Sequence, residues 1–396
     1  MLWPGYLYIN SEVGTIMNKI KILIVAGSME IGGIENQLMH LLRNADKDHF
    51  QIDFTTTSKK PYYRSEMERL GARCIQIPKT HDKLYIPYCK FLYQLLRKGQ
   101  YDVVHSHELF HSGMVVAIAR AAGVPHRFVH AHNWSDGNGT SKKTSLIRRI
   151  YNTVMQKSIR RFGTEFLACS TLAGKFLYGD YIVNQSNYHL IYNSVDTTKY
   201  LAHYDHVENG EFCEDGWINV LQVGRFTPIK NQLFTAQIAK ELKRRGLKIR
   251  ILCAGNNGND YEAQVADAIK REQLEEHMLL LGIRNDIDVL ARKCSAFLLP
   301  SLYEGMPLVL IEAQAAGLPC VIADTFSHEV DYGLGLIHWM PLEKSASDWA
   351  DAVEAAVSTP RAPKADVVAA IEKGGFDSKI FAQKLCNLYE TSVRKM

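Results

Sequence analysis

The sequence has no long apolar run and no paired cysteines, and both absences restrict its class. No stretch of its 396 residues approaches the roughly 18–20 apolar residues of a membrane-spanning helix. The eight cysteines include no C-x-x-C pair, and several lie inside apolar runs, such as Cys253 and Cys320. A reduced thiol packs there as a small hydrophobic side chain. These features predict a cytoplasmic protein without disulfides or a membrane span.

Two short motifs are also missing. Residues 1–16 lack the basic segment and the cleavage site of a secretory signal. Because Met17 opens a run that looks like a natural protein start, we expect residues 1–16 to be a disordered extension. Gly27 and Gly32 are five positions apart and do not form the G-x-G-x-x-G sequence of dinucleotide-binding enzymes. This argues against an oxidoreductase or a sugar epimerase, although both stay open as alternatives.

Composition and charge indicate a globular protein of more than one domain. Hydrophobic residues make up 46% and charged residues 22%, which is ordinary for a folded chain, and the length corresponds to two or three domains. The first 200 residues contain 25 Lys and Arg against 15 Asp and Glu, whereas the rest contains 21 against 27. This asymmetry favours two domains, of which the first faces an anionic partner.

Short β-branched runs alternate with helical patterns, as in βα units on a parallel sheet. The predicted strands are 21–27, 51–56, 73–77, 102–106, 127–131, 165–170 and 188–192, then 217–224, 248–255, 277–282, 296–301 and 319–324. The polar stretch 197–216 predicts a linker, and residues 376–396 predict a terminal helix. We therefore predict an α/β protein with two Rossmann-like, doubly wound parallel-sheet domains, residues 17–196 and 217–375, facing each other across a cleft.

The segment 298–319 combines two carboxylates with a helix start. Pro307 suits the first position of the helix, so Glu304 precedes it and Glu312 lies about two turns inside, on roughly the same side. The free N–H groups around this helix start suit a phosphate, and they belong to Gly305, Met306 and Leu308. The alternative is an acidic residue that stabilises the helix dipole, plus a solvated glutamate.

Charged and flexible residues follow two other predicted strands. Arg225 and Lys230 come after strand 217–224, at the sheet edge where α/β proteins bind ligands. Their guanidinium and ammonium groups would neutralise a diphosphate, and ordinary surface charge is the alternative. Gly32 and Gly33 let the backbone approach a phosphate or a sugar, although a simple turn explains them equally well.

Histidines cluster after two predicted strands, His105, His107 and His111 in one segment and His130 and His132 in the next. His-x-His spacing is compatible with zinc, but no third type of ligand accompanies it in the sequence. We therefore expect hydrogen-bonded rings near the crevice and no metal. Asp286 and Asp288 form a D-x-D sequence at a predicted helix start, where helix capping is the better explanation.

Residues 141–162 contain seven basic and no acidic residues, with apolar residues every three or four positions. This pattern predicts an amphipathic basic helix. Such a helix can lie on an anionic membrane surface. A packed helix whose charges merely face water is the alternative.

Four segments together resemble a known family. IGGIE, VGRFTPIKNQ, LGIRND and YEGMPLVLIEAQAAGLP, with its E-x7-E spacing, look like the family-4 retaining glycosyltransferases of the GT-B fold. The last of these, together with VHAHN, is most similar to bacterial exopolysaccharide and capsule enzymes, and the resemblance extends from about Lys19 to the end. It implies a nucleotide-sugar donor bound mainly to the second domain, and a last helix that crosses back to the first.

The resemblance also implies roles for individual residues. Arg225 and Lys230 would hold the donor diphosphate and Glu312 the ribose. Glu304 would orient the transferred sugar, and His132, or else His130, would contact it. The implied catalytic residues are thus Arg225, Lys230, Glu304 and His132. The remaining implied contacts are Ile283 and Arg284 to the base, Gly32 and Gly33 to the diphosphate, Gly305, Met306, Pro307 and Leu308 around the donor, and His107, His130 and Asn133 toward the acceptor.

The combined expectation is a metal-independent, retaining glycosyltransferase without a cofactor. It would transfer a sugar from a nucleotide diphosphate, with UDP as the expected nucleotide, to a lipid-linked oligosaccharide, at the inner face of the cytoplasmic membrane. No nucleic acid partner is expected. The second alternative is a non-catalytic protein of polysaccharide assembly that has kept the fold.

Overall fold

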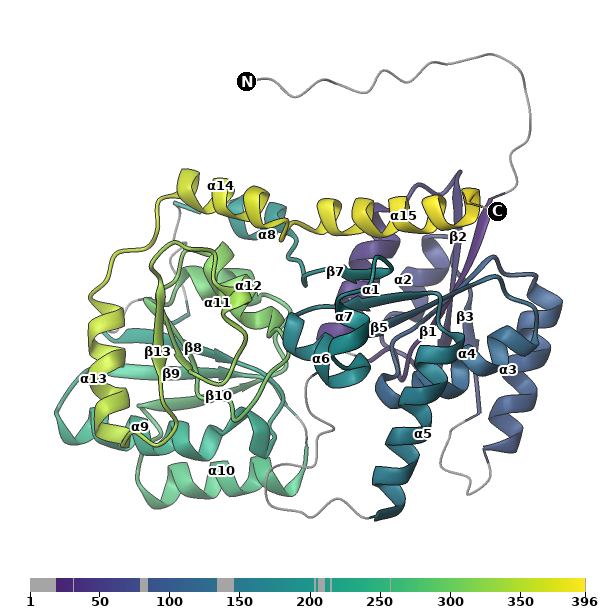
Figure 1. Cartoon of the computed structure of the whole chain (residues 1–396). Coiled ribbons are helices and arrows are strands. Elements are labelled where there is room, and N and C mark those ends of the chain that lie inside the picture. Colours follow the sequence, from purple (N-terminus) through teal and green to yellow (C-terminus); the bar gives the residue numbers. More distant parts are fainter. Residues whose placement is uncertain are drawn as a thin grey trace.

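The computed structural model describes residues 19–30, 32–78, 85–133, 146–202, 204–205, 211–213, 216–256 and 258–395. The predicted extension 1–16 lies outside these residues. The chain forms two parallel sheets, of seven strands in the order β3-β2-β1-β4-β5-β6-β7 and of six in the order β10-β9-β8-β11-β12-β13. Helices cover the sheets, and the two domains lie side by side (Figure 1).

The first sheet consists of β1 Ile20–Val25, β2 Phe50–Thr56, β3 Cys74–Gln76, β4 Val103–Ser106, β5 His126–Ala131, β6 Glu165–Ala168 and β7 Tyr188–Leu190. Its helices are α1 Gly33–Asn44, α2 Arg64–Arg69, α3 Ile86–Gly99, α4 Ser112–Ala121, α5 Leu146–Phe162, α6 Thr171–Tyr178 and α7 Asp180–Val183, with the 3-10 turn η1 Leu109–His111. The short helix α8 Thr197–Leu201 lies inside the predicted linker, so that segment is not wholly irregular.

The second sheet consists of β8 Ile218–Val223, β9 Ile249–Ala254, β10 Met278–Gly282, β11 Ala296–Leu299, β12 Cys320–Ala323 and β13 Ile337–Met340. Its helices are α9 Gln232–Arg244, α10 Asp260–Arg271, α11 Ile287–Arg292, α12 Leu308–Ala315, α13 Ala346–Val357 and α14 Lys364–Gly374, with the 3-10 turns η2 Pro228–Lys230 and η3 His328–Val330. The last helix is α15 Ser378–Arg394.

The strands form where apolar runs can be buried on both faces. All residues of β9, β11 and β12 are buried, as expected for central strands of a parallel sheet covered by helices. Every predicted strand has a counterpart. The strand β13 was not among those predicted; it is an edge strand whose four residues are only partly buried.

Strand order locates the ligand edge of each domain. The direction of winding reverses between β1 and β4 in the first sheet and between β8 and β11 in the second. Open α/β sheets bind ligands outside the carboxyl ends of the strands at such switch points. The loops that carry Gly32, His107, Arg225 and Glu304 therefore all lie at ligand edges.

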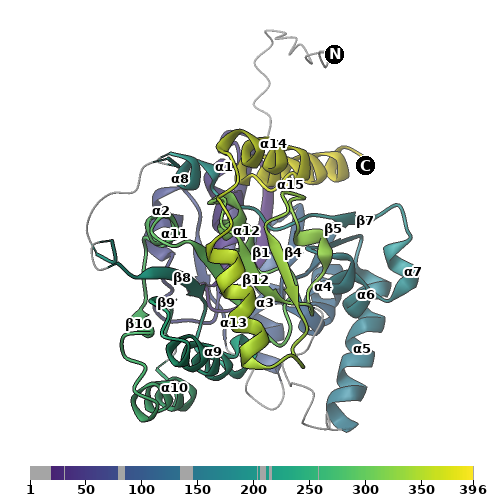
Figure 2. The same cartoon turned by 90° about the vertical axis from the view of Figure 1, so that its left-hand side faces the viewer.

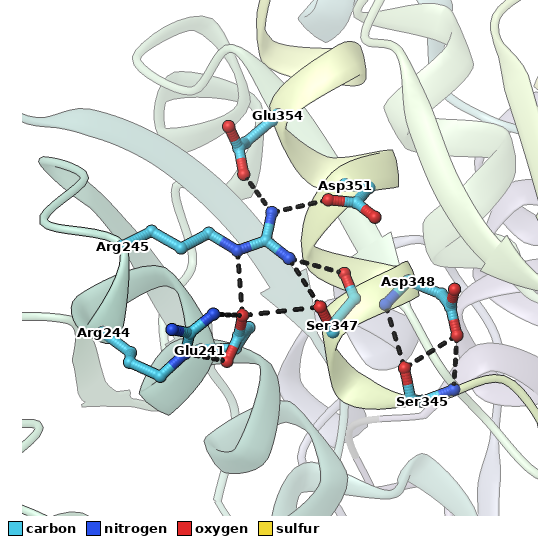
Figure 3. Close-up of polar contacts among 8 residues, drawn as sticks. All are labelled: Glu241, Arg244, Arg245, Ser345, Ser347, Asp348, Asp351 and Glu354. Atoms are coloured by element: carbon cyan, nitrogen blue, oxygen red, sulfur yellow. Dashed lines mark hydrogen bonds and ion pairs between the residues drawn. The ribbon is translucent and has the colours of Figure 1, made fainter.

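An arginine network fixes α13 onto α9 on the outside of the second domain (Figure 3). Arg245 donates to Glu241 at 2.9 Å and to Asp351 at 2.6 Å, and it also contacts Glu354. Hydrogen bonds from Arg244 and Arg245 lower the pKa of Glu241 to about 2. Single exposed ion pairs contribute little, so this network positions α13 rather than dominating stability.

The chain crosses between the domains twice, and the two crossings lie next to each other. Val195 and Asp377 form a parallel bridge, in which Val195 N donates to the Phe376 oxygen at 2.8 Å and Ser378 N to the Val195 oxygen at 2.9 Å. After the second crossing, α15 lies over the first domain while α14 stays over the second (Figures 1 and 2). The inner face of α15 joins the core of β1 and β2 through Phe381, Ala382, Leu385, Cys386 and Tyr389.

The basic helix begins at Leu146 within the described residues, and residues 141–145 lie outside them. Its second half packs on the domain, where Ile159 is fully buried and the Ser158 hydroxyl donates to the Gly113 oxygen at 2.6 Å. Its first half is uncovered: Leu146, Ile147, Ile150 and Val154 are 72%, 81%, 56% and 50% exposed. Figure 1 shows this end of α5 projecting from the first domain.

Candidate active site

The loop after β8 places a cation beside a carboxylate. Lys230 ends the turn η2, and its Nζ lies 2.5 Å from Glu304 Oε1, with both side chains less than one-fifth exposed. The Lys230 stem passes close to Gly224, where an added Cβ would lie 3.0 Å from Lys230 Cε. Gly224 also adopts a φ of +156°, in a region that favours glycine. Arg225 follows on the exposed side of this loop.

The loop after β11 is held against that lysine loop. Leu302 N donates to the Ile229 oxygen at 2.8 Å, and Asn231 Nδ2 donates to the Pro300 oxygen at 3.1 Å. These bonds attach the segment that carries Glu304 to the segment that carries Lys230. The two predicted diphosphate and sugar contacts therefore lie in one rigid unit between neighbouring strands.

The same loop contacts the first domain directly. A Cβ added at Gly305 would overlap the carbonyl oxygen of His132 and lie 3.3 Å from the Cα of Asn133. Asn193 Nδ2 donates to the Met306 oxygen at 2.7 Å, which anchors the next residue of the loop. Only a residue without a side chain lets the two backbones approach so closely.

The helix start and Glu312 differ in detail from the sequence prediction. Pro307 is the N-cap residue, with φ −68° and ψ 114°, so α12 begins at Leu308 rather than at the proline. Glu312 is partly buried and forms a hydrogen bond with Tyr200 of α8. Burial raises the pKa of Glu312 to about 7, and the Tyr200 hydrogen bond opposes that rise. This carboxyl therefore keeps its proton to a higher pH than an ordinary glutamate does.

The glycine loop of the first domain faces the arginine of the second. Gly33 begins α1 and is exposed, and an added Cβ there would meet nothing within 4 Å. Gly32 lies against the carboxylate of Glu35. Burial raises the pKa of Glu35, and the positive charge of Arg225 opposes that rise across the domain boundary.

The segment 282–284 is predicted to contact the base largely through its backbone, and its side chains face solvent or Asp286. Ile283 is 59% exposed, and Arg284 donates from Nε and Nη2 to Asp286, both at 2.8 Å. The prediction that the Asp286 side chain caps a helix is wrong. Asp286 precedes α11, but its carboxylate accepts hydrogen bonds from Arg284 and none from a helix N–H. Asp288 pairs with Arg292 at 3.5 Å.

The histidine pairs form one cluster rather than two. His107 Nδ1 lies 2.8 Å from His132 Nε2, and the rings of His130 and His132 stack at 4.3 Å. His105 lies behind them, with Nδ1 2.6 Å from the Tyr389 hydroxyl. His111 is separate and faces the Tyr151 hydroxyl at 2.9 Å. The sequence did not show that the histidines of β4 and those of β5 lie together, although these two strands are neighbours in the sheet.

Sequence reasoning missed several residues that join the domains. Asn193 follows directly after the predicted strand 188–192, and a polar residue at a strand end was the available signal. On another part of the boundary, Glu329 accepts from Thr171 N at 2.9 Å and also from the Thr171 hydroxyl. No local pattern marked Glu329, because its partner is 158 positions away in the chain.

The site thus consists of charged residues at the ligand edges of two doubly wound domains. Similar solved structures include a glycosyltransferase from Rickettsia africae, with a TM-score of 0.74, 15% identity and coverage of 96% of this chain and 100% of that one. Another is Anabaena Alr3699/HepE in complex with UDP and glucose, with a TM-score of 0.73, 18% identity and coverage of 94% and 99%. The architecture is the GT-B fold, as predicted.

The sequence comparisons identify the family. Residues 31–199 match the family described as Glycosyltransferase Family 4, and residues 218–359 match Glycosyl transferases group 1. The chain is 30% identical over 380 residues to the putative glycosyltransferase EpsF of Bacillus subtilis, covering 95% of this chain and 97% of that protein. It is also 29% identical over 296 residues to the capsular polysaccharide biosynthesis glycosyltransferase CapH of Staphylococcus aureus, covering 74% and 78%. The chain belongs to these family-4, group-1 glycosyltransferases.

Proposed function

We propose that this glycosyltransferase retains the anomeric configuration and transfers a sugar from a UDP-sugar to a hydroxyl of a lipid-linked oligosaccharide, without a metal ion in the transfer step. The observation that carries the proposal is the ion pair of Lys230 and Glu304 at 2.5 Å, held at the switch point beside Arg225. This ion pair joins Lys230, which is assigned to the diphosphate, with Glu304, which is assigned to the transferred sugar.

The relatives support the substrate classes. The chain is 30% identical over 244 residues, 59% of its length and 60% of the other, to an Escherichia coli UDP-Gal:alpha-D-GlcNAc-diphosphoundecaprenol alpha-1,3-galactosyltransferase. That protein's name gives a UDP-sugar donor and a lipid-linked acceptor, and Anabaena Alr3699/HepE is in complex with UDP and glucose. Together with CapH and its capsular polysaccharide, these relatives support a role in polysaccharide synthesis.

The ion pair indicates which contacts change when the donor binds. A diphosphate beside Lys230 and Arg225 would replace Glu304 as the partner of the ammonium group. Glu304 would then be released toward the hydroxyls of the sugar. Glu312, on the other side of the helix start, would accept from the ribose, and the N–H groups around Gly305 would face the phosphate.

The same groups provide the chemistry. Lys230 and Arg225 stabilise the negative charge that develops on the diphosphate as the bond to the sugar breaks, a contribution that is large in a preorganised site. The acceptor hydroxyl attacks from the face of the leaving group, whose phosphate oxygen takes its proton, so the anomeric configuration is retained. Domain contacts at Gly305 and Glu329 exclude water, which would otherwise hydrolyse the donor.

Substitution of the cations tests the proposal. We expect Arg225→Ala and Lys230→Ala each to lower turnover by roughly 10²–10³-fold, the scale for losing one preorganised group at developing charge. Lys240→Ala is the matched control, because it also breaks a lysine–glutamate pair, with Glu272 at 2.7 Å, but on an outer helix. Near-wild-type turnover in Lys230→Ala would overturn the assigned role, and an inverted anomeric configuration in the NMR spectrum of the product would overturn retention.

The exposed end of α5 supports docking to an anionic membrane, where a lipid-linked acceptor lies. Its apolar residues Ile147 and Ile150 are uncovered, and Arg148 and Arg149 are exposed beside them. Each basic residue near an anionic surface contributes about 1 kcal/mol, and apolar side chains insert at the headgroup boundary. Within the described residues, no helix is both long enough and apolar enough to span a bilayer.

Vesicle sedimentation tests this docking. Replacing Arg148 and Arg149 by Gln, or Ile147 and Ile150 by Ser, should weaken binding to vesicles that contain anionic lipid, while turnover on a short soluble acceptor stays largely intact. The matched control replaces Lys364 and Lys373 by Gln, two exposed residues of α14 on the opposite side of the molecule (Figure 1). Unchanged binding at low salt in the α5 variants would refute the docking role.

A further inference from the structure

Three buried histidines bring their ring nitrogens together at the ends of β4 and β5. His105, His107 and His130 are 0%, 8% and 1% exposed, and one ligand atom from each lies within 4.8 Å of the others. We propose that these three residues bind a transition-metal ion of the Zn²⁺ class. The sequence predicts no metal here, and the ion would take no part in the transfer step proposed above.

The hydrogen bonds leave the required nitrogens available. His105 Nδ1 is engaged by the Tyr389 hydroxyl at 2.6 Å, and His107 Nδ1 by His132 Nε2 at 2.8 Å. Among the residues that the structure describes, Nε2 of His105, Nε2 of His107 and both nitrogens of His130 are buried without a hydrogen-bond partner. His105 and His107 thus resemble metal-binding histidines, in which one ring nitrogen is hydrogen-bonded to an outer partner and the other faces the ion. His130 has no such outer partner among the described residues.

A metal ion that binds one nitrogen of each ring would provide a partner for three of these four nitrogens. A buried polar atom without a partner costs free energy, and here four such atoms lie in one cluster. Burial lowers the pKa of all three histidines well below the usual range, so the rings are neutral, as a metal ligand must be. Imidazole ligands suit zinc and its transition-metal neighbours rather than magnesium or calcium.

The ligand atoms would have to come closer together to bind an ion. With Zn–N bonds of about 2.0–2.1 Å, tetrahedral ligand atoms lie about 3.4 Å apart, compared with the present limit of 4.8 Å. Three protein ligands leave a fourth position for water. Because Tyr389 belongs to α15, the ion would couple β4 and β5 to the helix that crosses back over the first domain.

Direct binding measurements test the site. Tag-free protein stripped of metal should bind one equivalent of Co²⁺ with the visible absorption of a four-coordinate ion, and Zn²⁺ should displace it. X-ray absorption of the Zn²⁺ form should show imidazole nitrogens at about 2.0–2.1 Å. Tyr389→Phe, which removes the outer partner of His105, should weaken Zn²⁺ binding about tenfold, the low end for such partners.

Variants separate this site from the other histidines of the chain. His107→Gln and His130→Gln should abolish the Co²⁺ spectrum. His40→Gln should retain it, because His40 is a buried imidazole of the same domain that is bonded to Ser194 at 3.1 Å. Failure of the wild type to bind Zn²⁺ at one equivalent, an octahedral Co²⁺ spectrum, or an unchanged His130→Gln would overturn the proposal. If the histidine variants do not fold, X-ray absorption of the wild type and the Tyr389→Phe affinity decide it.

Discussion

A single methyl group at Gly305 should separate the donor loop, which follows β11 and carries Glu304 and Gly305, from the first domain. In Gly305→Ala, the new Cβ would overlap the His132 carbonyl oxygen and lie 3.0 Å from its carbonyl carbon and 3.3 Å from Asn133 Cα. These are backbone atoms at the end of a buried strand, so they cannot rotate away as a side chain would. The two segments must therefore move apart by roughly 1 Å. Gly305 has no positive φ, so the alanine itself adds no backbone strain.

The expected loss is mainly one of activity. A misplacement of about 1 Å in a catalytic site can cost around 10²-fold in rate, and overpacking of this kind costs about 1–3 kcal/mol of stability. We expect kcat/KM with the UDP-sugar to fall by about 10²-fold, with a modest decrease in Tm. Gly27→Ala is the control, because an added Cβ there meets nothing within 4 Å. If Gly305→Ala keeps wild-type turnover, the contact with His132 does not hold the donor loop.

Three further outcomes are expected. Burial raises the pKa of Glu312 to about 7, so its carboxylate fraction grows from about one-tenth at pH 6 to nine-tenths at pH 8. The affinity for the UDP-sugar, measured by calorimetry, should therefore rise up to tenfold over this range. In Glu312→Gln the affinity should not depend on pH. Transfer should survive excess EDTA, and loss of activity that Mg²⁺ or Mn²⁺ restores would assign a metal to the reaction. Glu329→Gln, which weakens the bonds to Thr171 across the domain boundary, should increase hydrolysis of the donor relative to transfer, and an unchanged ratio would exclude that contact from domain closure.

The fold and the meeting of Lys230 with Glu304 follow from local patterns. Strands such as β9 and β11 are continuous apolar runs because both faces are buried, and a run of that kind is visible in the sequence. Lys230 and Glu304 follow β8 and β11, which are neighbours in the sheet, so the rule for strand ends brings them together. Their ion pair is thus a consequence of topology.

The contacts between the domains could not be predicted in the same way. The approach of Gly305 to His132 and the bond from Asn193 to Met306 depend on how two separately folded sheets are oriented. That orientation is set by many weak long-range contacts, and no single segment carries a periodic signal for it. The meeting of His107 with His130 likewise required the pairing of β4 with β5.

The position of α15 has a consequence for how the chain folds during synthesis. Phe381, Leu385 and Tyr389 fill part of the core of β1 and β2, although those strands leave the ribosome first. Domains usually fold in the order in which they are made, but here the first sheet has to wait for α15, which follows the whole second sheet in the sequence. Until α15 emerges, an apolar surface on the first domain stays uncovered and open to aggregation. The first domain is therefore the last to complete its core.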